Sequence, residues 1–212
     1  LAAPIMTAFI APQIVVPTML VHGSVLNVVI MVHARHHLSI RRVAMLALPG
    51  AIATPLGTYL LVVLDESVLK IAIGVVVGGT ALAMLAGYNR ASRREGLASV
   101  PVGATSGLLN ASTGLAGPPV VLFFANQGVD PREFRATIVG HFIVLNIVAI
   151  PAYILAGIFT RDQMLFASTL LPAALAGAGA GIGLARFVSQ RLFMRIALAL
   201  VLFPISVQFE DP

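Results

Sequence analysis

Six apolar stretches, each long enough to cross a lipid bilayer, constrain the fold of this chain more than any other feature of its sequence. A helix that spans the hydrocarbon core of a membrane needs about 17–25 largely apolar residues. Brief polar connectors separate these stretches from one another and from a further apolar segment at 100–125, and residues 1–10 have the composition of the end of an earlier stretch. The six stretches comprise residues 12–33, 43–64, 69–88, 134–159, 164–185 and, somewhat shorter, 192–207.

Composition excludes the alternatives to a membrane protein. Of the 212 residues, 58% are hydrophobic and 10% are charged, whereas an average soluble domain has about 25% charged residues. This content is too apolar for a water-exposed surface or for a disordered chain. No connector is long enough to be a soluble domain, so the sequence predicts one all-α polytopic membrane domain over residues 1–212.

The basic residues point to membrane orientation rather than to nucleic acid. The chain has 13 Lys and Arg and a net charge of +5, but no basic stripe interleaved with aromatic residues. The basic residues lie mostly in the connectors, where an excess marks the cytoplasmic side. We therefore expect no nucleic-acid partner, and contacts with membrane lipid instead.

Residues 100–125 are apolar but unsuited to one continuous helix. Their centre combines polar residues with two glycines and a double proline, which weaken or break helices. A single crossing would leave Arg132 and Arg135 outside, whereas a re-entrant hairpin returns both to the cytoplasmic side. The sequence therefore predicts a hairpin with arms of about 14 and 11 residues, roughly 21 and 16 Å long, and a polar tip near mid-membrane.

Short matches between the two halves predict inverted repeats. Residues 1–4 match 115–118, the segment around Asn27 matches the segment around Asn146, and two further pairs follow in the same order. Each repeat would hold a re-entrant hairpin and three transmembrane helices, an odd number of passes that inverts the second copy. Repeat 1 covers residues 1–99 and lacks its first hairpin arm at the N-terminus, and repeat 2 covers residues 100–212. This architecture is typical of secondary transporters.

The hairpin tip is the best candidate for a binding site. A half-helix beginning near Leu115 would direct free N–H groups and its positive dipole end toward a cavity, which suits a small anion. Asn27 and Asn146 occupy matched positions within spans, so each either faces the tip or makes an interhelical hydrogen bond. The predicted substrate-binding residues are Asn110, Ser112, Thr113, Gly114, Gly117, Pro118, Asn27 and Asn146.

Ionisable residues inside the spans are few. His22 and His141 are the two candidates for carrying a coupling proton, although their places near span ends favour interfacial histidines. The acidic residues before the C-terminal tail all lie in connectors or at their edges, so the intramembrane carboxylate of a cation-coupled carrier is missing. With no cysteine, and with the histidines of residues 33–37 in a basic connector, we expect no metal and no cofactor.

Small-residue motifs predict close helix packing, compatible with a homodimer. They are Gly74-xxx-Gly78, Gly103-xxx-Gly107, Gly177-xxx-Gly181 and Gly179-xxx-Gly183. Ser106 invites comparison with an intramembrane serine protease, for which His141 would have to be the base. No sequence feature places these two side chains together.

The segment from Gly103 to Pro119, followed by residues 128–130 and 135–137, resembles the TauE/SafE sulfite exporter family. Residues 49–50, 55–57 and 60–65 are similar to the signature of that family's first repeat, and the resemblance spans essentially the whole chain. It implies a multi-pass carrier of the bacterial inner (plasma) membrane that moves sulfite, sulfonates, sulfoacetate or related anions outward. It also implies that residues 110–119 form the substrate region.

The sequence as a whole predicts a secondary transporter that exports a small sulfur oxyanion by alternating access, and not an enzyme. An anion channel is the nearest alternative, because the absence of intramembrane carboxylates permits it. A non-transporting membrane scaffold or assembly factor is the alternative from another class.

Overall fold

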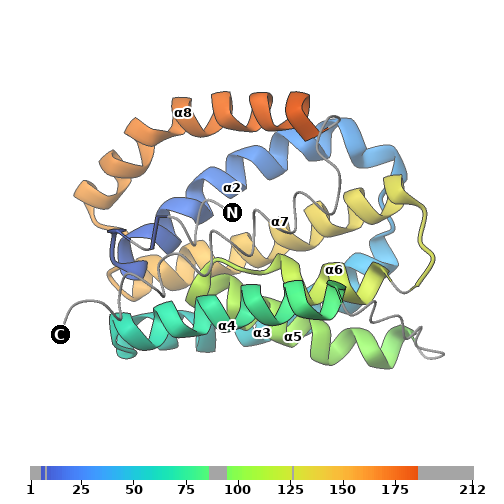
Figure 1. Ribbon diagram of the computed structural model, residues 1–212, viewed down its shortest axis with the longest axis horizontal. Helices are drawn as coiled ribbons and strands as arrows, with labels where there is room; N and C mark the ends of the chain where they lie inside the picture. Colours follow the sequence, from blue (N-terminus) through green and yellow to red (C-terminus); the bar gives the residue numbers. More distant parts are fainter. Residues whose placement is uncertain (1–5, 8, 86–94, 126, 186–212) are drawn as a thin grey trace.

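The structure, a computed structural model, describes residues 6, 7, 9–85, 95–125 and 127–185, and all regular secondary structure in these residues is helical (Figure 1). The predicted span at 192–207 lies outside the described residues. The elements are α2 (Pro12–Ala34), the short 3-10 helix η1 (Arg35–His37), α3 (Ile40–Val63), α4 (Glu66–Leu85), α5 (Glu95–Thr113), α6 (Gly117–Ala125), α7 (Pro131–Leu155) and α8 (Arg161–Ala185).

Four of the described helices are long and apolar enough to cross a membrane, and the chain is a membrane protein. They are α2 with η1, α3, α7 and most of α8. Large apolar side chains cover the outside of the bundle: Ile40, Ile52 and Leu155 are 76%, 81% and 89% exposed. Such a surface suits hydrocarbon as the surrounding solvent.

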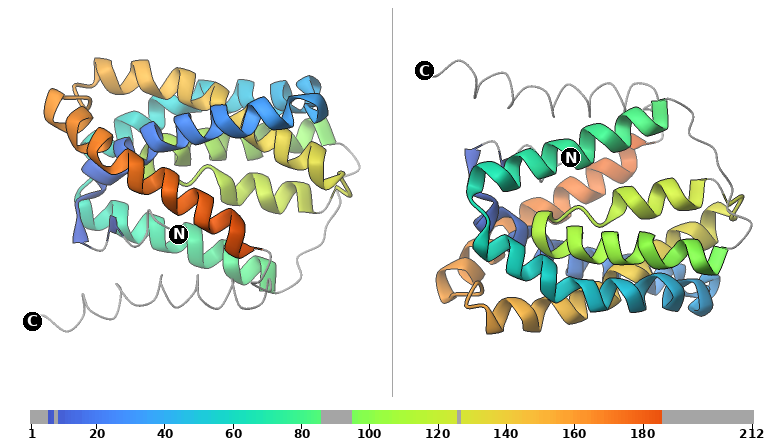
Figure 2. Two further views of the ribbon diagram at one scale, coloured as in Figure 1. Left: turned by 90° about the horizontal axis from the view of Figure 1, so that it is seen from above. Right: turned by 90° about the horizontal axis from the view of Figure 1, so that it is seen from below.

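Helices α5 and α6 form a hairpin that begins and ends at one end of the bundle. Arg42, in the first turn of α3, contacts Glu95 at 2.7 Å and Glu133 at 2.6 Å. Glu95 begins α5 and Glu133 lies in the first turn of α7, so α3, α5 and α7 all start at this end. The right-hand view of Figure 2 shows α5 and α6 side by side and running in opposite directions. That this hairpin is re-entrant in a membrane remains a prediction.

The packing of α3 against α5 depends on glycine. A Cβ atom on Gly103 would collide with the carbonyl oxygen of Leu46, and one on Gly107 would collide with that of Gly50. The predicted packing role of Gly103-xxx-Gly107 is therefore confirmed. By contrast, a Cβ built on Gly78, Gly177, Gly179 or Gly181 would have no described atom within 4 Å beyond the neighbouring backbone of its own helix.

Several helix boundaries differ from the sequence prediction by a few residues, and three of these differences concern the hairpin and the end of α7. The first hairpin arm begins at Glu95 rather than at residue 100, because Glu95 is held by Arg42 and suits the positive end of a helix. The second arm begins at Gly117 rather than near Leu115. Helix α7 ends at Leu155, four residues early, since Gly157 adopts a φ of 71° that turns the chain.

The core lies where α2, α7 and the hairpin meet. One cluster joins residues from α2, α3, α4, α5 and α7, and another joins α3 to α6. The first comprises Val16, Leu20, Leu61, Leu69, Ala111, Ala149 and Tyr153, and the second comprises Leu46, Val120 and Phe124. The tip of the hairpin is thus packed inside the bundle, whereas the first turns of α5 have exposed side chains, with Leu97 66% exposed.

Candidate functional site

The backbone break between α5 and α6 lies in the interior of the bundle. Gly114 has a φ of 72°, the left-handed conformation that commonly ends helices. Its N–H donates to the carbonyl of Asn110 at 3.1 Å, and the N–H of Leu115 donates to that of Leu109 at 3.3 Å. Ala116 is only 4% exposed. Gly114 and Leu115 are half-buried, so the break is covered at Ala116 and partly open before it, with two helix ends facing one small region.

The N-terminus of α6 offers fewer backbone donors than the sequence predicts. Pro118 and Pro119 lie in its first turn, where their missing N–H groups cost little. Because α6 begins at Gly117, however, these prolines occupy two of the positions whose N–H groups would otherwise be free. Gly117 N–H is the first-turn donor that remains, and it makes no backbone hydrogen bond among the described residues.

A chain of side-chain hydrogen bonds joins three helices beside the break. Asn110 Nδ2 on α5 donates to Asn146 Oδ1 on α7 at 3.2 Å, and Asn146 Nδ2 donates to Ser24 Oγ on α2 at 3.0 Å. Ser24 in turn donates to the carbonyl of Leu20 at 2.7 Å. Asn110 is 9% exposed and Asn146 is 6% exposed. These buried amides couple the hairpin to both long helices that flank it.

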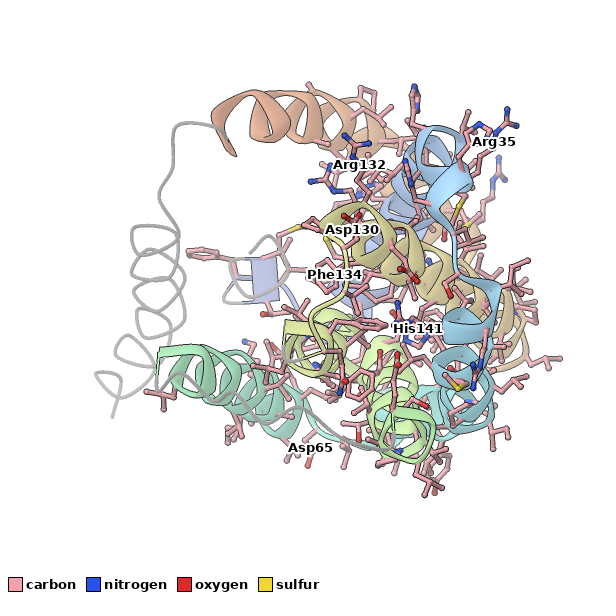
Figure 3. All side chains as sticks on the ribbon, turned by 90° about the vertical axis from the view of Figure 1, so that its right-hand side faces the viewer. Arg35, Asp65, Asp130, Arg132, Phe134 and His141 are labelled. Atoms are coloured by element: carbon pink, nitrogen blue, oxygen red, sulfur yellow. The ribbon has the colours of Figure 1, made fainter. Side chains whose placement is uncertain are left out.

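A second set of contacts holds the break itself. Ser106 Oγ donates to the carbonyl of Ala116 at 2.7 Å and lies 2.9 Å from His141 Nε2. A serine hydroxyl has one proton, so His141 Nε2 carries a hydrogen and donates to Ser106. His141 Nδ1 is buried without a hydrogen-bond partner among the described residues. In Figure 3, His141 lies between the helices, whereas Arg35 lies at the margin of the bundle.

Helix α7 provides most of the side chains that hold the hairpin. Besides His141 and Asn146, Tyr153 donates its hydroxyl to the carbonyl of Ala111 at 2.6 Å. Tyr153 is fully buried, and this bond satisfies one of the carbonyl groups in the last turn of α5. Both ends of the break are thus fixed from one helix.

The structure brings together only part of the predicted site. Ser112 and Thr113 are buried, but their hydroxyls donate to Leu108 and Leu109 of their own helix. Asn27 is half-buried and makes no side-chain hydrogen bond among the described residues, so it does not join Asn146. His22 lies on the side of α2 opposite Ser24, away from the break. Its ring contacts the carbonyl of Ala167 on α8 at 2.8 Å.

The sequence analysis did not identify three residues that belong to this site. Ser24 and Tyr153 gave no signal, because neither belongs to a repeat match. Ser106 was considered only as a nucleophile, and the structure does place it beside His141. The Ser106 hydroxyl donates its proton to the carbonyl of Ala116, and both Ser106 and His141 are 0% exposed. This geometry suits a pair that fixes the backbone of the break rather than one that attacks a substrate.

Charged side chains of the described residues lie toward the ends of the bundle. Arg42, Glu95 and Glu133 line a pocket of about 410 Å³ together with Arg41, Ser39, Met45 and Gly96. Lys70 pairs with Glu66 one turn away on α4. No group of three or more metal-ligating side chains occurs in the part of the chain that was described. An anion at the break would therefore be bound by neutral donors and by helix dipoles.

A family model described as Sulfite exporter TauE/SafE matches residues 1–209. No curated protein and no solved structure matches the chain.

Proposed function

The chain belongs to the TauE/SafE sulfite exporter family, and from this premise we propose that it exports a small sulfur oxyanion such as sulfite, a sulfonate or sulfoacetate. The proposed setting is the bacterial inner membrane, with several passes of the chain. The membership itself identifies a membrane transporter family rather than an enzyme family.

The break between α5 and α6 is the proposed substrate site. The observation that carries this proposal is the buried chain Asn110–Asn146–Ser24 beside an interrupted backbone. Interrupted backbone within a membrane protein is tolerated where protein or a lined cavity satisfies it, and half-helix N-termini in transporters face anionic groups. Neutral donors also suit transport, because they bind an anion without holding it as tightly as an arginine would.

Alternating access between inverted repeats is the proposed mechanism. Helix α7 packs along α2, and α3 packs against α7 while α8 packs against α2. These contacts are the ones expected if α2 corresponds to α7 and α3 to α8 in inverted copies. The hydrogen bond from Asn146 to Ser24 crosses between the proposed repeats, so it links the site to their relative movement.

Counterflow of radiolabelled sulfite in proteoliposomes tests this function. We expect saturable exchange by the wild-type chain and its loss in Asn110→Ala and in an Asn110→Ala, Ser112→Ala double variant. Ser99→Ala is the matched control, since Ser99 is also buried on α5 and donates only to Gly96 of its own helix. Sulfonates and sulfoacetate are tested in the same way.

Other outcomes select the alternatives. Flux without saturable counterflow would indicate an anion channel. No flux of any tested anion would favour a scaffold or assembly factor. Labelling of Ser106 by a serine-directed probe would favour an intramembrane serine protease. If transport depends on pH, we propose His22 as the coupling residue, and His22→Gln should abolish that dependence.

A further inference from the structure

The peptide group between Ala116 and Gly117 links the Ser106–His141 contact to the proposed site. A peptide unit is planar, and its C=O and N–H point in opposite directions when it is trans. The described residues contain no cis peptide bond. Fixing the carbonyl of Ala116 therefore also fixes the direction of Gly117 N–H.

We propose that Ser106 and His141 are positioning residues that orient Gly117 N–H toward the transported anion. This inference rests on the proposed function for its substrate. Ser106 holds the Ala116 carbonyl at 2.7 Å, and His141 holds Ser106 at 2.9 Å. Pro118 and Pro119 have no N–H, so Gly117 N–H is the donor that the first turn of α6 can offer to an anion. Its direction therefore sets the geometry of that hydrogen bond.

The surroundings of His141 suit a neutral donor. Its Nδ1 has no acceptor among the described residues, so a second proton there would be an unpaired buried donor. Its Cε1 lies against Gly50 on α3, its neighbour Phe142 has a ring centroid 5.8 Å away, and Ser106 approaches from α5. No described carboxylate or basic side chain contacts it. His141 thus acts as a fixed hydrogen-bond donor, distinct from the proton carrier that the sequence also allowed.

The chain of bonds also strengthens the donor that it orients. A carbonyl that accepts a hydrogen bond polarises its peptide group, so the N–H at the other end donates more strongly. The effect is transmitted from His141 through Ser106 to Gly117. Removing either side chain therefore weakens anion binding without removing any group that touches the anion.

Sulfite counterflow with full-length variants tests the inference. We expect Ser106→Ala and His141→Ala to raise the KM about tenfold while the maximal rate changes less than about twofold. His141→Gln keeps a neutral N–H donor and should restore much of the affinity at every pH. Ser99→Ala, the same change elsewhere on α5, should match wild type. A His141→Gln variant that behaves like His141→Ala and loses a wild-type pH dependence would overturn the positioning role.

A readout independent of transport separates this inference from the proposed function. In the ¹⁵N-glycine-labelled chain, the Gly117 amide signal is identified by its disappearance in Gly117→Ala. We expect Ser106→Ala to shift this signal without any ligand, and sulfite to shift it in wild type. If wild type neither transports nor responds to any anion, the proposed function fails. If the signal is unchanged in Ser106→Ala, the orienting role fails whatever the transport result.

Discussion

Gly117 can be replaced in two ways that separate its backbone N–H from its missing side chain. A Cβ at this position would meet Phe142 Cζ at 3.9 Å, an ordinary contact. Proline is well tolerated at the first position of a helix but has no N–H. We expect Gly117→Pro to raise the KM for the transported anion about tenfold, and Gly117→Ala to leave it within about twofold. Equal effects in counterflow would show that the N–H does not bind the anion.

The amides of Asn110 and Asn146 are expected to be coupled in stability as well as in transport. Replacing either by alanine removes the hydrogen bond between them and leaves one buried polar atom of the other amide unpaired, which costs about 1–3 kcal/mol in the free energy of unfolding. The double variant should lose less than the sum of the two single losses. Denaturant unfolding of the detergent-solubilised chain measures all three. Additive losses would mean that the 3.2 Å contact contributes nothing.

At the residue scale, the sequence identified the polar residues of the break but not their partners. The repeat match predicted that Asn27 and Asn146 would play similar parts, yet only Asn146 reaches the hairpin. The rotation of α7 about its own axis decides which of its residues face α5, and no short motif encodes that rotation. The contact of Ser106 with His141, 35 residues away, has the same origin.

At the element scale, the contact between α3 and α5 is the most sensitive to added volume. A Cβ on Gly107 would overlap backbone atoms of Gly50, which cannot move aside as a side chain would. Gly107→Ala should therefore lower the free energy of unfolding by about 1–3 kcal/mol. Gly177→Ala on α8 is the control, since its Cβ would meet no described atom and alanine favours the helix. Thermal unfolding in detergent should separate the two variants.

Helices were easier to predict than their ends. The spans over α2, α3 and α7 follow directly from apolar length, and the hairpin break follows from Gly114 with the double proline. The ends depend on contacts from distant elements. Glu95 extends α5 because Arg42 lies beside it, and no property of residues 95–99 alone predicts that.

At the scale of the whole molecule, the absence of cysteine allows a direct test of topology. We expect Arg35→Cys and Arg132→Cys to react with a membrane-impermeant maleimide from one side, and Asp65→Cys from the other. All three native side chains are exposed in the structure, and α3 separates Arg35 from Asp65 by the length of a full span. Arg35→Cys and Arg132→Cys labelled from opposite sides would mean that residues 95–125 cross the membrane once.

The dependence of the hairpin on α7 also bears on how the protein is made. The partners of Ser106, Asn110 and Ala111 lie 35, 36 and 42 residues further along the chain. At a synthesis rate of about 5–20 residues per second, these partners emerge from the ribosome on the order of seconds later. During that interval the polar groups of α5 have no interhelical partners from α7 and are poorly suited to hydrocarbon. We therefore expect the insertion machinery to shelter the hairpin until α7 arrives, so that packing of the hairpin into the bundle is a late step of biogenesis.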